Sequence, residues 1–120
     1  MKHPIVHFEI GCSSAAETQA FLEALFGWTF GGAAAPSVQV GASPQLSAHL
    51  SELADEWGHY VTFYVQVEHL ETLLSRVREL GGKVLVEPVQ VGDQGRFAWI
   101  TPPEGQIIGL WESVNPQEES

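Results

Sequence analysis

The sequence is poor in cysteine and in basic residues, and these shortages exclude several classes of protein. Its 120 residues include one cysteine, Cys12, so neither an internal disulfide nor a multi-cysteine zinc site can form. Five Lys and Arg stand against fifteen Asp and Glu, which gives a formal net charge of -10. Because nucleic acids and anionic lipids are bound by clustered basic side chains, we expect no nucleic-acid partner and no membrane partner.

The chain also lacks a long hydrophobic run. No apolar segment approaches the roughly 20 residues that cross a bilayer, and residues 1–4 lead directly into strand-like sequence instead of a signal peptide. We therefore expect a cytoplasmic protein. A hydrophobic content of 44% is enough for a core, and 120 residues are few for two ordinary domains, so we expect a single domain.

An internal repeat organises the sequence. Between residues 8 and 27, three identities recur at an offset of 55 residues, and they pair Phe8 with Phe63, Leu25 with Leu80, and Gly27 with Gly82. Each identity falls at the same point in the same succession of a strand, a helix, a glycine and a further strand. The match is therefore more specific than three identical residues alone would be. The repeat predicts two modules of the same topology.

The second copy has the clearer periodicity. Apolar and polar residues alternate over residues 61–67, which predicts a strand with two different faces. Over residues 70–80 the apolar residues recur at helical spacing, which predicts an amphipathic helix that buries Leu70, Leu73, Leu74, Val77 and Leu80. Gly81 and Gly82 follow and supply the positive φ that ends a helix.

The first copy predicts a helix of similar length. Ser13 or Ser14 is its expected N-cap, and Gly27 is its expected end. We expect this helix to bury Phe21, Leu22, Leu25 and Phe26. Further strands are predicted at residues 28–30, 38–40, 46–50, 83–87, 96–101 and 107–112, separated by Gly and Pro. Each half is therefore expected to be β-α-β-β-β, with module one at about residues 4–50, an acidic loop-like linker at 51–59, module two at about 60–113 and an acidic tail at 114–120.

Four motifs occur in order between residues 4 and 113. They are VHFEI from Val6 to Ile10, FGW from Phe26 to Trp28, GRFAWI from Gly95 to Ile100 and PEGQIIGLW from Pro103 to Trp111. In this order and spacing they resemble the vicinal oxygen chelate superfamily, which includes glyoxalase I, bleomycin-resistance proteins, fosfomycin-resistance enzymes and extradiol dioxygenases. The resemblance implies an α+β fold in which two tandem β-α-β-β-β modules form a curved mixed sheet around a ligand cavity. It is less specific for activity, since one fold serves many chemistries.

The resemblance also implies where a metal site would lie. Metal-dependent members carry a His or Gln on the first strand and a Glu or His on the last strand of module one, with a His and a Glu at the matching positions of module two. His7 matches the first position, whereas the module-two positions hold Thr62 and Gly109. On the last strand of module one the matching residue is either His49 or Ala48, because a shift of one residue along the strand turns the side chain to the opposite face of the sheet. The implied site is incomplete, with His7 and His49 as its candidate ligands for Zn, Fe, Mn or Ni.

Two further residues are candidates for catalysis. Glu9 shares a strand face with His7, and this pair offers a general base near neutral pH, or else a polar pair bonded within the sheet. Tyr64 shares a face with Thr62, where its hydroxyl could orient a ligand or act as a weak acid, or could lie on the sheet surface.

Aromatic residues on the strands are candidates for ligand contacts. Trp99 and Trp111 lie on predicted strands of module two, and Trp111 shares a face with Gly109. Aromatic walls suit a planar or hydrophobic ligand, although the same residues could fill a small core. The predicted ligand-binding set is His7, Thr62, Tyr64, Trp99, Gly109 and Trp111.

These observations favour a small-molecule-binding protein with an incomplete metal site and no tightly bound cofactor. The alternative is a divalent-metal-dependent lyase, isomerase or dioxygenase that acts on a substrate with vicinal oxygens. A third class is a non-catalytic sequestering protein, of the kind that the drug-binding members of the superfamily represent. We expect a homodimer, because the superfamily exposes sheet edges.

Overall fold

The computed structural model describes residues 3–31, 37–41 and 46–114. In these residues the chain is α+β, as predicted, with eight strands and three helices. It divides into an N-terminal unit, Val6–Phe63, and a C-terminal unit, which comprises Met1–Ile5 and Tyr64–Ser120. The last six residues of the predicted acidic tail lie outside the described residues.

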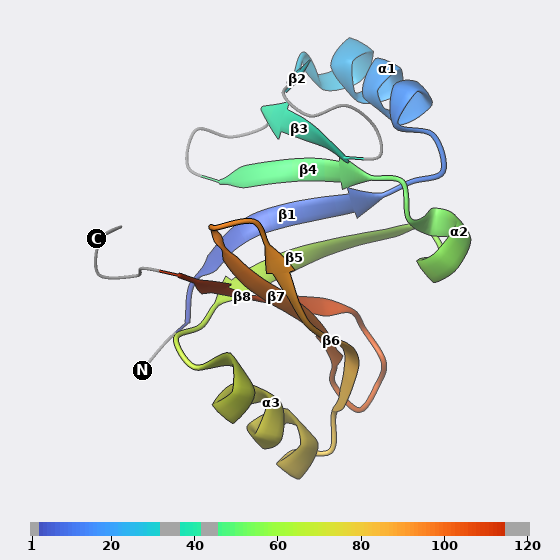
Figure 1. Ribbon diagram of the computed structural model, residues 1–120. Coiled ribbons are helices and arrows are strands. Elements are labelled where there is room, and N and C mark those ends of the chain that lie inside the picture. The colour runs from blue at the N-terminus through green and yellow to red at the C-terminus, as the bar shows by residue number, and fades with distance from the viewer. Residues whose placement is uncertain (1–2, 32–36, 42–45, 115–120) are drawn as a thin grey trace. The chain divides into compact units, whose positions relative to one another are not determined.

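The N-terminal unit contains a mixed sheet and a covering helix (Figure 1). In chain order its elements are β1 (Ile5–Gly11), α1 (Ala15–Phe26), β2 (Thr29–Gly31), β3 (Ser37–Gly41), β4 (Ser47–Ser51) and α2 (Ala54–Trp57). The strands follow the order β2-β3-β4-β1, in which β4 and β1 are parallel and the other pairs antiparallel.

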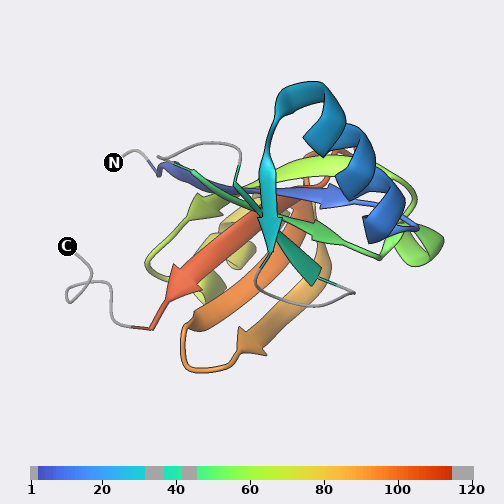
Figure 2. The same ribbon diagram turned by 90° about the horizontal axis from the view of Figure 1, so that it is seen from above.

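The C-terminal unit repeats this arrangement. Its elements are β5 (Tyr60–Gln66), which starts in the N-terminal unit, α3 (Leu70–Glu79), β6 (Lys83–Val91), β7 (Gly95–Thr101) and β8 (Ile108–Ser113). The order is β5-β8-β7-β6, with β5 and β8 parallel and the antiparallel strands β8, β7 and β6 drawn in red to orange in Figure 2. Both halves are therefore β-α-β-β-β, which confirms the repeat.

The linker differs from its prediction, because it contains a helical turn instead of a loop throughout. Helix α2 buries Ala54, whose N–H donates to the Cys12 carbonyl oxygen at 3.3 Å, and Gly58 N–H closes the turn on the Ala54 carbonyl oxygen at 2.7 Å. Asp55 and Glu56 lie in its first turn, where negative charge favours a helix. The acidic residues that suggested a solvated loop are thus equally suited to a helix N-terminus.

Helix α1 has the predicted ends but not the predicted buried face. The Ser14 side chain accepts from Glu17 N–H, and Gly27 ends the helix with a φ of 70°. Phe21, Leu25 and Phe26 are exposed, at 63%, 59% and 55%, so their predicted burial is wrong. The inner side of the helix instead carries buried Ala15 and half-buried Thr18, Gln19 and Leu22, and Ala15 and Leu22 pack in the core cluster with Cys12 and Leu50.

Helix α3 follows its prediction except at the end. Leu70 and Leu74 are buried in a cluster with Val67, Ala98 and Leu110, against which Leu73 packs. Leu80 is exposed because the helix has already ended and the chain turns at Gly81, whose φ is 91°. No helix in the described part of the chain is long and apolar enough to cross a membrane.

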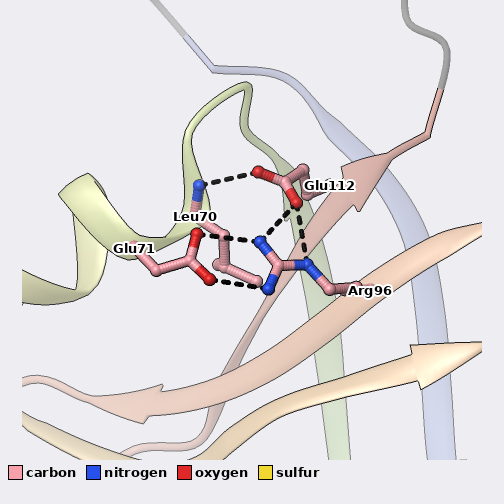
Figure 3. Close-up of polar contacts among 4 residues, drawn as sticks. All are labelled: Leu70, Glu71, Arg96 and Glu112. Carbon is pink, nitrogen blue, oxygen red and sulfur yellow. Dashed lines mark hydrogen bonds and ion pairs between the residues drawn. The ribbon is translucent and has the colours of Figure 1, made fainter.

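A glutamate from the end of each module caps that module's long helix. Glu52, directly after β4, accepts from Ala15 N–H at 2.8 Å, and Glu112 on β8 accepts from Leu70 N–H at 2.9 Å. The side chain of Arg96 holds Glu112 in place, with its Nε at 3.0 Å and its Nη2 at 2.7 Å from Glu112 Oε1 (Figure 3). Negative charge at a helix N-terminus satisfies free N–H groups and interacts favourably with the helix dipole.

Arg96 also binds Glu71 in the first turn of α3. Its Nη1 and Nη2 lie at 2.6 and 2.8 Å from the two carboxylate oxygens, a bidentate pairing (Figure 3). The hydrogen bonds from Arg96 lower the pKa of Glu71 to about 2. One arginine therefore ties β7, β8 and the start of α3 together.

Replacement of Glu112 by Ala should destabilise the protein, because it removes the cap of α3 and leaves Arg96 with one partner. We expect a loss of about 2 kcal/mol in the free energy of unfolding, measured by urea denaturation. Glu79→Ala is the matched control, since its exposed pair with Arg76 at 3.2 Å should contribute less than about 0.5 kcal/mol. Equal losses in the two variants would contradict the structural role of Glu112.

Candidate functional site

Strands β1 and β4 separate an apolar face from a polar face. On one side Ile10, Ala48 and Leu50 pack with Ala15 and Leu22 of α1. The opposite side carries His7, Glu9 and Gly11 of β1 beside Ser47 and His49 of β4, since side chains alternate along a strand. The parallel register pairs His7 with Ser47 and Glu9 with His49, which brings these side chains together.

This arrangement decides between the two candidates on β4. Ala48 packs on the side of α1, and His49 lies on the side of His7. The alternation of residues along β4 does not show which of the two side chains lies on the side of His7, whereas the pairing of β4 with β1 does. His7 and His49 are therefore neighbours, as the prediction of a shared site required.

A continuous series of polar contacts connects five side chains, which we call the polar chain: Ser47, His7, His49, Glu9 and Tyr60. Ser47 Oγ lies 2.5 Å from His7 Nδ1, and His7 Nε2 lies 2.5 Å from His49 Nδ1. His49 Nε2 lies 3.5 Å from Glu9 Oε1, and the Tyr60 hydroxyl donates to Glu9 Oε2. The two imidazole rings are also stacked, with centroids 4.7 Å apart.

The polar chain runs from an exposed end to a buried end. Ser47 is exposed, His7 and His49 are half-buried, and Glu9 is only 2% exposed. Burial, together with the neighbouring His49, lowers the pKa of His7 to about 4, against an opposing effect of Glu9. Burial likewise lowers the pKa of His49, which Glu9 again opposes. Both imidazoles are therefore neutral at pH 7, and the contact of His49 with Glu9 joins a neutral ring to a carboxylate.

Tyr60 and Gly11 belong to this site, although the sequence analysis did not single them out. A side chain at Gly11 would overlap the Tyr60 ring, so glycine is required where that ring lies over β1. Tyr60 could have been found from the alternation of Tyr60, Thr62 and Tyr64, which extends the predicted strand of residues 61–67 by one residue toward the N-terminus. Ser47 could have been found in the same way, because it lies two residues from His49.

The candidates of the C-terminal unit form a second, more apolar group. The indole Nε1 of Trp99 donates to the Tyr64 hydroxyl at 2.8 Å, and both residues are buried. A side chain at Gly109 would overlap the Tyr64 ring, so this glycine makes room for an aromatic ring just as Gly11 does. The Tyr64 ring also meets Phe97 edge-on, with centroids 6.2 Å apart. Tyr64 thus has a hydrogen-bonded position and is not a sheet-surface residue.

Two other predicted residues have distinct surroundings. Thr62 is buried on β5, with its hydroxyl 3.5 Å from the Phe63 carbonyl oxygen. Trp111 is half-buried on the same face of β8 as Gly109, and its indole Nε1 donates to Ser113 Oγ at 3.0 Å. His59 contacts Ser13 at 3.3 Å and is not part of the polar chain.

The candidate metal ligands do not have the geometry of a metal site. Two imidazole nitrogens on one tetrahedral zinc ion lie roughly 3.3 Å apart, because each bond is about 2.0–2.1 Å long. His7 Nε2 and His49 Nδ1 face each other at 2.5 Å, which is too close for an ion between them. Across residues 3–31, 37–41 and 46–114, no group of three or more His, Cys, Asp or Glu could hold a metal ion. The side chains as placed therefore do not fit the group that the resemblance implies.

Solved structures with the same arrangement of elements cover nearly the whole chain. A glyoxalase/bleomycin resistance protein/dioxygenase superfamily member from Vibrio splendidus is 18% identical, with a TM-score of 0.67 over 94% of this chain and 100% of its own. The chain has the vicinal oxygen chelate fold. The methylmalonyl-CoA epimerase from Mycobacterium tuberculosis is 14% identical, with a TM-score of 0.63 over 97% of this chain and 91% of its own. At these identities the likeness shows the fold alone.

Sequence comparison adds a short match. The glyoxylase-named protein CFP32 of Mycobacterium tuberculosis is 34% identical over 50 residues, which span 42% of this chain and 19% of that protein. The same protein of Mycobacterium bovis matches equally. No family model matches the sequence.

The lowered histidine pKa values predict that stability falls as the pH falls from about pH 7 to about pH 5. The unfolded His7 takes up a proton near 6.5, whereas the folded one does so only near 4, so between these values the unfolded state binds more protons and is favoured by acid. His7→Gln should reduce this pH dependence, read from urea midpoints at both pH values. His59→Gln should leave it unchanged, and equal slopes in wild type and His7→Gln would contradict the assignment.

The close approach of Tyr60 to Gly11 predicts that Gly11→Ala is destabilising. The added methyl group must displace the tyrosine ring, with an expected loss of about 1–3 kcal/mol in the free energy of unfolding. Gly31→Ala is the matched control, since nothing lies within 4 Å of the added atom. Tyr60→Ser should recover part of the loss in a double-mutant cycle, and strict additivity would show that the ring is not the obstacle.

Proposed function

We propose that this chain is a small-molecule-binding protein of the glyoxalase/bleomycin-resistance type, and that the polar chain binds a polar group of its ligand. The observation that supports this most directly is the series of contacts from exposed Ser47 to buried Glu9. It lies on the face of β1 and β4 opposite the α1 cluster. The covered face carries Ile10, Ala48 and Leu50 there, so these polar side chains are concentrated on the opposite side.

The burial of Glu9 supports a function beyond folding. Removing a carboxylate from water is costly unless hydrogen bonds compensate, and an apolar residue would serve stability at least as well. Glu9 is nevertheless 2% exposed, with Tyr60 and His49 as partners. Clusters of buried titratable groups are typical of functional sites.

In the C-terminal unit, Trp111 of the predicted set and its neighbour Phe97 are separate candidates for contact with an apolar ligand. Trp111 and Phe97 are paired across β8 and β7 and are only half-buried, so their rings retain exposed surface. Rings of this kind suit a planar or hydrophobic group. Trp99 and Tyr64 are more suited to supporting such a surface, because they are buried and bonded to each other.

The proposal predicts that small aromatic and carbonyl compounds raise the melting temperature of the wild-type protein. A ligand at a hundredfold excess over its Kd adds about 2.7 kcal/mol to the stability of the native state. Calorimetric titration of any such compound should show weaker binding to Glu9→Gln and unchanged binding to Glu104→Gln, a matched change at an exposed turn. If no compound stabilised the protein, or if Glu9→Gln bound as tightly as wild type, the proposed site would be wrong.

A further inference from the structure

Helix α1 exposes large apolar side chains on the side that faces away from its own sheet. Phe21 and Leu25 are 63% and 59% exposed, and the neighbouring alanines Ala20 and Ala24 are exposed as well. These four residues lie on two adjacent rows of the helix, because each row joins residues four apart. We call them the α1 stripe. Figure 1 shows α1 covering one side of the N-terminal sheet, with the other side of the helix directed outward.

The internal repeat provides a comparison for the α1 stripe. At the offset of 55 residues, its four residues match Ser75, Arg76, Glu79 and Leu80 of the second module. Arg76 and Glu79 form an exposed ion pair at 3.2 Å, which suits a surface in contact with water. Helices α1 and α3 occupy the same place in the same β-α-β-β-β topology. The fold itself therefore does not require an apolar stripe on α1.

We infer that the α1 stripe is the surface on which a second copy of this chain packs, with the two α1 helices antiparallel across a two-fold axis. This inference does not depend on the proposed ligand site. The homodimer expected from the sequence was assigned to exposed sheet edges, whereas the α1 stripe is a helix surface.

The α1 stripe is complementary to itself. Phe21 and Leu25 form a ridge, and the row of Ala20 and Ala24 beside it leaves a groove. Two helices pack when the ridge of one enters the groove of the other, and rows of residues four apart are the commonest pairing. A two-fold axis across the stripe seats both ridges in both grooves at once. One surface carries both halves of the contact, which favours a second copy over an unlike protein.

The distribution of charge also favours a second copy. The four residues of the α1 stripe are uncharged, and residues 6–63 include no Lys or Arg. An acidic partner would find no opposite charge there. A basic partner would be attracted to acidic residues such as Glu17 and Glu23 more than to the stripe. The contact is therefore apolar.

The exposed area fits a weak and reversible dimer. A buried aromatic side chain covers about 150–250 Å², so the α1 stripe offers on the order of 300 Å² per copy at the exposures of Phe21 and Leu25. Stable interfaces take about 800 Å² from each partner, and the net charge of -10 on each copy adds repulsion. We expect a dissociation constant of about 10 μM to 1 mM.

Sedimentation equilibrium tests the dimer directly. Wild-type protein between about 10 μM and 1 mM should show a monomer–dimer equilibrium. Phe21→Glu should raise the dissociation constant by about a hundredfold or more, because each dimer would bury two unpaired carboxylates. Leu80→Glu is the matched control, since Leu80 is equally exposed, at 63%, and the variant gains the same charge outside the stripe. It should dimerise as wild type does.

The salt dependence tests the nature of the contact. Higher ionic strength should strengthen the dimer, because salt screens the repulsion between two copies that each carry a net charge of -10. A dimer that weakens with salt is held by ion pairs, and this result would overturn the apolar contact.

Cross-linking tests the two-fold axis. An axis across the stripe brings one position of the helix close to the same position of the second copy, within the reach of a disulfide. Air oxidation should therefore link at least one of Ala20→Cys and Ala24→Cys into a covalent dimer. Ser75→Cys, which matches Ala20 in the repeat, is the control and should remain unlinked. The native Cys12 is buried and should not react.

Three results would overturn the inference. The first is a wild-type protein that is monomeric over the whole concentration range. The second is a dimer that Phe21→Glu leaves unchanged, which would place the contact on another surface such as a sheet edge. The third is a monomer whose urea midpoint falls in Phe21→Glu but not in Leu80→Glu, because the stripe would then be covered within one copy. None of these results affects the proposed ligand site.

Discussion

The parallel pairing of β1 with β4 is the constraint on which the candidate site depends. It places His7 opposite Ser47 and Glu9 opposite His49, so that alternate residues of two strands form one polar surface. The intervening residues, such as Ile10 and Leu50, meet α1 and contribute to the apolar core. A shift of one residue in this register would bury the polar set against α1 and expose the core. Such a shift would be unfavourable in free energy, so the register is fixed and the polar side chains stay on one face.

The two units use one topology for different chemistry. In each unit a glycine makes room for a tyrosine ring on β5, Gly11 for Tyr60 and Gly109 for Tyr64. Tyr60 donates to a buried carboxylate, whereas Tyr64 accepts from an indole. Thr62 and Gly109 stand where the resemblance implies metal ligands, and the carboxylate of this site comes instead from Glu9, two residues beyond His7. The fold therefore retains its framework while the acid–base groups are gathered in the N-terminal unit.

Sequence reasoning identified most of the fold and part of the site. The repeat, the caps at Ser14 and Gly27 and the helix of residues 70–79 follow from local patterns, which depend on neighbours in the chain. The burial of α1 did not follow, because the rotation of a helix with many apolar residues is set by its contacts with the sheet. His7, Glu9 and His49 were recognised as candidates, whereas Tyr60 was missed because its role depends on a carboxylate 51 residues away.

The sequence by itself determined the α+β class, the two modules and the shortage of cysteine and basic charge. These are properties of composition and of periodicity within a few residues. Only the tertiary structure decided that His49 and not Ala48 joins His7, and that the two histidines contact each other and lead to Glu9. Both outcomes depend on the register of strands far apart in the chain, which hydrogen bonding between the strands sets and local alternation cannot specify.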